Sequence, residues 1–174
     1  MTDINSQVFL FINREIANPI LDFLVLKILI PLFLFFGIIP FLMLFSKKYR
    51  NLGAFSLISG ILCYGLGHLI KFLFCLPRPL DVFPDTRIIG PGHVGEFSFP
   101  SATTMLAFGL ALPFFLEKSK FRYFFLILAL LVGISVIYTG FHFPRDVIAG
   151  IFFSIFIVFS LNEIKKKWPE KLKI

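Results

Sequence analysis

Long apolar stretches separated by short polar connections dominate this chain. Five of them read as membrane-spanning helices, at about 26–45, 52–76, 101–116, 123–139 and 147–161. A helix that crosses the hydrocarbon core needs roughly 20 mostly apolar residues. The third and fifth stretches are shorter, so we expect them to begin inside the protein, below the membrane surface. The pattern predicts an all-α fold, a polytopic membrane helix bundle with about five transmembrane helices.

The segment before the first apolar stretch has a different pattern. Val8, Phe9 and Leu10 lie among polar residues between Asp3 and Asn18. This mixture predicts an N-terminal interfacial amphipathic helix over 1–18 rather than another span. A frayed polar tail is the alternative.

Composition supports one membrane-embedded domain over 1–174. The chain is 57% hydrophobic, whereas soluble domains contain about 45–50% apolar residues. Mean hydropathy is +0.90. We expect residues 77–100 to form an outer loop over a functional site and residues 162–174 to form a basic tail.

The positive charge follows the connections between spans. The net charge is +7, and most of the 17 Lys and Arg fall in three segments, 47–50, 118–122 and 165–173. With five spans, these segments share one side of the membrane, and the positive-inside rule makes that side cytoplasmic. Anionic lipid and topology explain this charge better than nucleic acid does. We therefore expect a multi-pass protein of a bacterial inner membrane, with the 77–100 loop facing the periplasm or exterior.

Polar residues gather at the outward ends of the spans. His142 and Asp146 are four residues apart, which would place both on one helical face. A carboxylate bonded to one imidazole nitrogen fixes the tautomer and raises the basicity of the other nitrogen. The alternative is a capping carboxylate beside an interfacial histidine.

Two cations and a helix start accompany this pair. Lys71 and Arg78 are about two turns apart at the outward end of the second span, before Pro79. A lysine and an arginine suit phosphate oxygens, although both could instead extend to lipid headgroups. Ser101 and Thr103 follow Pro100, where free N–H groups and hydroxyls form either an anion cradle or an ordinary helix cap.

Taken together, these residues resemble the type 2 phosphatidic acid phosphatase family of integral membrane lipid phosphatases. The family pattern has three parts: Lys, six residues, Arg-Pro; then Pro-Ser-Gly-His; then Ser-Arg, five residues, His, three residues, Asp. The first part is complete here, and the other two are partly matched, in the segments Lys71–Pro79, Pro100–Thr103 and Ser135–Asp146.

The resemblance implies a role for each matched residue. His142 would attack phosphorus and form a phosphohistidine, and Asp146 would orient it. The phosphate-binding residues would be Lys71, Arg78, Ser101, Thr103 and Ser135. The reaction would need no metal and no cofactor, and the substrate would be a phosphorylated lipid in the bilayer. No oligomeric state follows from the sequence.

Two positions depart from the family pattern. Thr103 stands where the family has the histidine that protonates the leaving group, and Val136 stands where it has a second arginine. Losing a general acid costs about 10²–10⁴ in rate. The candidate substitutes are His93, Arg145, His68 and Arg87. The alternative for each is a solvated loop residue or a satisfied buried histidine.

Because Thr103 is a poor proton donor, this sequence favours a substrate whose leaving group needs little protonation. Undecaprenyl pyrophosphate and the anomeric phosphate of lipid A fit this condition better than phosphatidylglycerol phosphate or phosphatidate. A lipid-to-lipid phosphotransferase is the rival reaction. A catalytically impaired relative that only binds lipid phosphate is the rival of another class.

Overall fold

Helices are the only regular secondary structure in the described part of the chain, which confirms the predicted all-α class. A computed structural model describes residues 3–90 and 95–167. In chain order the elements are α1 (Ile4–Leu10), the π-helical η1 (Phe11–Glu15), α2 (Pro19–Phe23), the π-helical η2 (Leu24–Leu29), α3 (Ile30–Phe36), α4 (Ile38–Met43), α5 (Arg50–Phe74), α6 (Pro79–Val82), α7 (Ala102–Leu116), α8 (Arg122–Tyr138) and α9 (Pro144–Lys167).

Three helical stretches are long and apolar enough to cross a membrane. They are Pro19–Met43, Arg50–Val82 and Pro144–Lys167, and α7 and α8 are shorter apolar helices. The short third span is therefore as expected, with 15 residues in α7. The expectation of a short last span is wrong, because α9 has 24 residues and continues through the basic segment to Lys167.

The first span begins earlier than the predicted Leu26. The Asn18 side chain accepts hydrogen bonds from the backbone N–H groups of Ile20 and Leu21, each at 3.0 Å. Pro19 occupies the first helical position, where its missing N–H costs nothing. A capped start at Pro19 therefore extends the apolar stretch by about two turns, which contain one acidic residue, Asp22.

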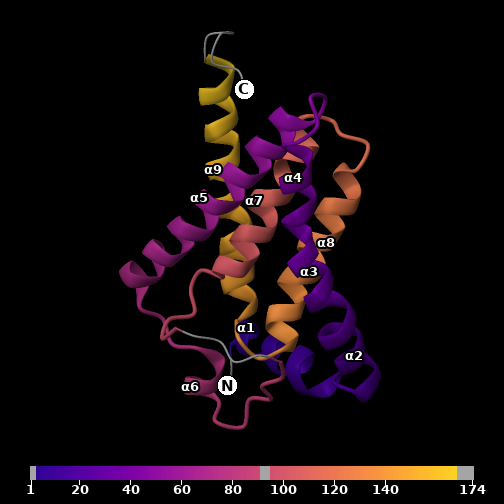
Figure 1. Cartoon of the computed structure of the whole chain (residues 1–174). Helices are drawn as coiled ribbons and strands as arrows, with labels where there is room; N and C mark the ends of the chain where they lie inside the picture. Colours follow the sequence, from indigo (N-terminus) through magenta and orange to yellow (C-terminus); the bar gives the residue numbers. More distant parts are fainter. Residues whose placement is uncertain (1–2, 91–94, 168–174) are drawn as a thin grey trace.

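Helix α7 is the centre of the bundle. It packs against α5, α8 and α9, and in Figure 1 it lies between them. Close approach to α5 depends on Gly109, where a Cβ atom would lie 2.8 Å from the Ser59 carbonyl oxygen. A helix that is apolar on all sides, as α7 is, belongs in a core.

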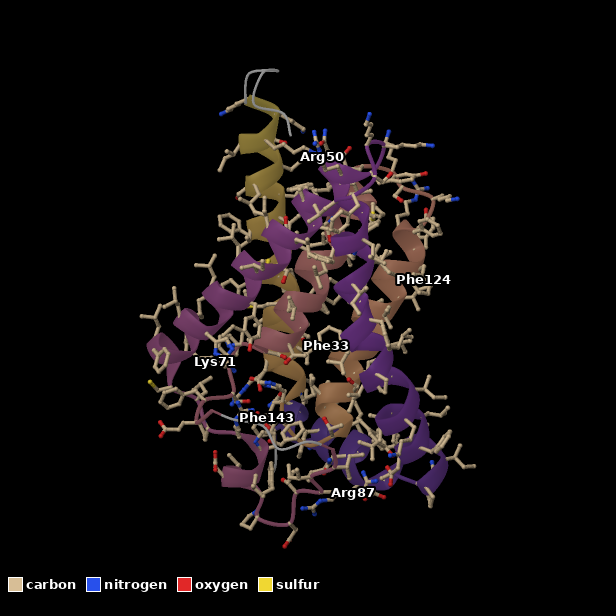
Figure 2. All side chains as sticks on the ribbon, in the orientation of Figure 1. Phe33, Arg50, Lys71, Arg87, Phe124 and Phe143 are labelled. Atoms are coloured by element: carbon tan, nitrogen blue, oxygen red, sulfur yellow. The ribbon has the colours of Figure 1, made fainter. Side chains whose placement is uncertain are left out.

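The bundle has two chemically different ends. The ends of α4, α7 and α9 and the starts of α5 and α8 lie together at the top of Figure 1, whereas α1, α2, α6 and the start of α9 lie at the bottom. Side-chain nitrogen atoms cluster around Arg50 at the top end in Figure 2. We call these the basic end and the site end. Their assignment to cytoplasm and exterior stays a prediction.

The N-terminal segment packs into the site end. Phe9 and Asn13 are fully buried. The Phe9 ring centroid lies 5.2 Å from that of Phe143 and 6.3 Å from that of Phe83. The segment is therefore a packed part of the bundle, and its location in the membrane interface stays a prediction.

Candidate active site

The histidine and the carboxylate meet where α9 begins. His142 Nδ1 lies 3.5 Å from Asp146 Oδ2, and neither side chain is exposed. Their expected placement on one helical face is wrong, because Pro144 opens α9 and His142 precedes it. The Phe143 backbone N–H donates to Asp146 Oδ2 at 2.8 Å. Asp146 therefore both caps the helix and holds the loop that carries His142.

Ser98 completes this buried cluster. Its hydroxyl donates to Asp146 Oδ2, and its Oγ lies 3.5 Å from His142 Nδ1. The Ser98 backbone N–H donates to the Leu76 carbonyl at 2.8 Å, which ties this residue to the end of the second span. Sequence reasoning missed Ser98, because it lies outside the family motifs and a serine in a loop carries no signal of its own.

The surroundings of His142 favour a neutral imidazole. Burial lowers its pKa to about 4, against a smaller opposite effect of Asp146, and the charges of Lys71 and Arg78 lower it further. An unprotonated ring nitrogen is what a nucleophile requires.

Lys71 lies on the buried face of α5. The side chain is 6% exposed. Its ammonium group donates to the carbonyl oxygens of Phe97 and Ser98, each at 2.9 Å. Lys71 therefore holds the segment that carries Ser98 against α5.

Arg78 joins two loops at the start of α6. Its Nε donates to the Gly95 carbonyl at 2.7 Å and its Nη1 to the Phe141 carbonyl at 3.0 Å. Phe141 directly precedes His142, so this guanidinium lies beside the loop of the histidine–carboxylate pair. Figure 2 shows Lys71 and Phe143 in the same region of the site end.

A small cavity opens beside the two cations. Its volume is about 240 Å³, and it is lined by His68, Lys71, Phe72, Arg78, Gly95, Glu96 and Phe97. The charged groups of Lys71 and Arg78 therefore border space that an anion could enter.

The predicted hydroxyl residues lie in different settings. Ser101 caps α7, and its Oγ accepts hydrogen bonds from the Thr104 N–H and hydroxyl at 3.3 and 2.9 Å. The Ser101 backbone N–H donates to the Asp146 carbonyl at 3.0 Å, so α7 starts beside the cluster. Thr103 is half-buried in the first turn of α7. The Ser135 hydroxyl donates to the Val132 carbonyl of its own helix at 2.7 Å.

Val136 belongs to an apolar cluster. It is 8% exposed and packs with Phe9, Ile137, Phe143 and Val147. Side chains from the N-terminal helix and the histidine loop thus surround the position where the family carries an arginine.

The residues that could replace the missing proton donor and the missing arginine lie in different places. His68 lines the small cavity, with its ring against Tyr64. Arg145 Nε lies 3.6 Å from Asp146 Oδ1. Arg87 instead pairs with Asp22. His93 lies outside the described residues.

Asn13 was also missed by sequence reasoning. Its side-chain amide donates to the carbonyls of Arg87 at 2.8 Å and Tyr138 at 2.9 Å, and its Oδ1 accepts from the Arg87 N–H at 3.0 Å. One buried amide therefore ties the N-terminal segment to the outer loop and to the end of α8. The chain offers no local motif for such a long-range contact.

The fold and this site define an integral membrane helix bundle with a buried histidine–carboxylate pair beside two cations. The PAP2 superfamily matches residues 52–169. The chain therefore belongs to this superfamily of membrane lipid phosphatases. This confirms the resemblance that its sequence motifs indicate.

Individual relatives match most of the length of this chain in sequence or in structure. The bacitracin transport permease protein BcrC of Bacillus licheniformis is 30% identical over 154 residues, which are 86% of this chain and 74% of that protein. The undecaprenyl-diphosphatase of Sulfolobus acidocaldarius is 30% identical over 131 residues, which are 75% of this chain and 63% of that protein. The crystal structure of Aquifex aeolicus LpxE superposes with a TM-score of 0.68 at 26% identity, covering 93% of this chain and 96% of that one.

Proposed function

We propose that this protein removes phosphate from a lipid phosphate or pyrophosphate through a phosphohistidine intermediate on His142. The observation that carries the proposal is the buried cluster of His142, Asp146 and Ser98 next to Lys71 and Arg78. A nucleophile, the group that orients it and two phosphate-binding cations are thus within one small region of the site end.

The orientation of the imidazole assigns its two nitrogens. Nδ1 lies 3.5 Å from Asp146 Oδ2, so we assign the ring proton to Nδ1 and the bond to phosphorus to Nε2. Nε2 forms a bond to phosphorus as the bond from phosphorus to the lipid-side oxygen breaks. Water then cleaves the N–P bond, releasing inorganic phosphate and restoring the neutral histidine. No metal or cofactor takes part in either step.

Lys71 and Arg78 stabilise the charge on the transferring phosphoryl group. Both donate to backbone carbonyls of the 95–98 and 141 segments, which holds their charged groups in place, and both residues line the small cavity. Oriented donors lower the barrier because they need little reorganisation as charge develops. Ser101, Thr103 and Ser135 are the further phosphate-binding residues of the proposal.

The substrate class follows from the missing acid. Thr103 is a poor proton donor, so a leaving group that is stable as an anion reacts fastest. A lipid pyrophosphate, such as undecaprenyl pyrophosphate, or an anomeric lipid A 1-phosphate meets this condition. The 30% identity to an undecaprenyl-diphosphatase supports the first of these. His68, which lines the cavity with Lys71 and Arg78, is our candidate for the remaining proton donation.

A second candidate function is binding of a lipid phosphate without turnover. It is favoured by the apolar surroundings of Val136, which provide no second guanidinium for the phosphate. The intact pair of His142 and Asp146 favours catalysis instead.

A panel of lipid phosphates separates these functions. The purified protein is incubated with undecaprenyl pyrophosphate, lipid A 1-phosphate, phosphatidylglycerol phosphate and phosphatidate, with and without a second lipid as acceptor. We expect release of inorganic phosphate from the first two, and none from His142→Gln. Binding without release on all four would establish the second candidate, and phosphate transfer to the acceptor lipid would establish a phosphotransferase.

A further inference from the structure

A larger cavity lies at the basic end of the bundle, far along the helices from the site. Its volume is about 770 Å³. It is lined by the end of α4, the start of α5, the turn between α7 and α8, and the last turns of α9. Figure 1 shows these segments together at the end opposite α1 and α6.

Apolar side chains form most of its wall. They include Ile39, Ile58, Leu161 and Ile164. Ile39, Ile58 and Ile164 are 41%, 47% and 52% exposed, so the wall continues onto the outer surface of the spanning helices. Such a surface faces acyl chains in a bilayer rather than water.

The charged groups of the wall are three lysines and one glutamate. Lys48, Lys120 and Lys165 line the cavity together with Glu117. Lys165 pairs with Glu117 at 2.5 Å, which leaves the positive charges of Lys48 and Lys120 without an acidic counterpart in the wall. Their ammonium groups lie over neighbouring rings, Lys48 over Tyr49 at 5.2 Å and Lys120 over Phe121 at 4.9 Å.

We propose that this cavity binds one anionic phospholipid of the adjacent leaflet. Its phosphate lies between Lys48 and Lys120, and an acyl chain lies along the wall formed by Ile39, Ile58 and Ile164. An apolar hollow at the end of spanning helices excludes a soluble anion as the natural occupant, and its two unbalanced lysines select an anionic headgroup over a zwitterionic one. Basic pockets between spanning helices recognise lipid headgroups in this way. This inference does not depend on the chemistry proposed for His142.

The test compares lysines that differ in position but not in charge. Thermal unfolding of the detergent-purified protein is measured against increasing phosphatidylglycerol, with phosphatidylcholine of the same chains as the neutral arm. Lys48→Gln with Lys120→Gln removes both cavity charges. Lys47→Gln with Lys118→Gln is the matched control, since Lys47 is adjacent to Lys48, Lys118 is two residues from Lys120, and neither lines the cavity.

We expect phosphatidylglycerol to raise the melting temperature of the wild type and of the control. The cavity variant should need about 30-fold more phosphatidylglycerol for half of the effect, since two lysines at roughly 1 kcal/mol each are removed and every 1.4 kcal/mol corresponds to a factor of ten. Ala54→Phe, which places a ring in the cavity, should weaken the response without removing any charge.

Three results would overturn the proposal. Equal stabilisation by phosphatidylcholine would remove the selection for an anionic lipid. An equal loss in the control variant would assign the effect to the overall charge of this end. Full stabilisation by glycerophosphoglycerol, the headgroup without chains, would remove the role of the apolar wall.

Discussion

At the scale of single residues, the site is held together by contacts from distant parts of the chain. Asp146 accepts hydrogen bonds from Ser98 and from the Phe143 backbone, and Lys71 donates to the segment that carries Ser98. Each group therefore limits the movement of the next. In the reaction we propose, a histidine held in this way loses little entropy on reaching the transition state.

The protonation of His142 predicts the acid side of the pH profile. Its pKa is lowered to about 4 by burial, so the neutral, reactive form persists as the pH falls below the ordinary value of about 6.5. We expect kcat/KM to stay nearly constant as the pH falls through 6.5 and to drop to half of its value only near pH 4. A pH series on undecaprenyl pyrophosphate measures this. An acid limb centred above pH 6.5 would contradict the buried, neutral histidine.

Thr103 predicts a dependence on the leaving group. Thr103→His restores the family's proton donor in the first turn of α7, and it should raise turnover most on phosphatidate, whose alcohol leaves poorly. On undecaprenyl pyrophosphate the gain should be small. Turnover rates on both substrates measure the difference, and no gain on either would show that family analogy fails at this position.

His68 supplies the control for this prediction. If His68 donates the proton, then His68→Gln slows the chain as it stands and does little in the Thr103→His background. Equal damage in both backgrounds would remove His68 from the reaction, and the same comparison applies to His93.

The sequence predicted the site residues that belong to motifs. The spacing of Lys71, Arg78, His142 and Asp146 was enough to place them at one end, because spans that end on one side bring their terminal residues together. Ser98 and Asn13 could not be found in this way. Their roles depend on which distant backbone groups they meet, and no local pattern encodes that.

At the scale of elements, the N-terminal helix supports the loop that carries His142. Phe9 of α1 packs against Phe143, one residue after His142. The Arg145 backbone N–H also donates to Asn5 Oδ1 at 2.9 Å. The loop between α8 and α9 is therefore held from below by the first helix of the chain.

Replacing Phe9 should affect both stability and activity. Phe9→Ala removes a fully buried ring, and such a change costs about 3–5 kcal/mol. It should also lower kcat by loosening the His142 loop. Phe11→Ala is the matched control, because Phe11 is 56% exposed. Thermal unfolding and phosphate release measure both variants, and equal effects of the two would contradict a supporting role for α1.

The boundaries of elements were less predictable than their existence. Each of the five apolar stretches corresponds to a helical segment, because hydropathy follows burial in lipid. The starts at Pro19 and Pro144 were missed, since a cap such as Asn18 or Asp146 acts through hydrogen bonds that a hydropathy pattern does not detect. The basic residues 165–167 continue α9 because lysines at a helix C-terminus favour it.

At the scale of the whole molecule, charge separates the two ends of the bundle. Arg50 lies at the basic end in Figure 2, where Lys48 and Lys165 line the larger cavity, and the His142 cluster lies at the other end, where α9 begins. The positive-inside rule then predicts that the cluster faces the periplasm or exterior. The predicted orientation follows from the distribution of charge in the sequence. The structure adds the information of which residues lie at the same end of the bundle.

Cysteine labelling in whole cells tests this orientation. Asp85→Cys, in the outer loop, should react with a membrane-impermeant thiol reagent, and Ser119→Cys, in the turn between α7 and α8, should react only after the cells are opened. Both are made in a Cys75→Ser background, because Cys75 is exposed. The reverse pattern would place the site on the cytoplasmic side.

The central claim is that phosphate passes through His142. The protein is mixed with undecaprenyl pyrophosphate labelled at its terminal phosphorus, quenched in alkali, which preserves phosphohistidine, and digested for mass spectrometry. We predict a phosphoryl group on His142 that appears before free phosphate and is absent, together with turnover, in His142→Gln. Free phosphate released by His142→Gln at a rate near that of the wild type, or a phosphoryl group on another residue, would contradict the account.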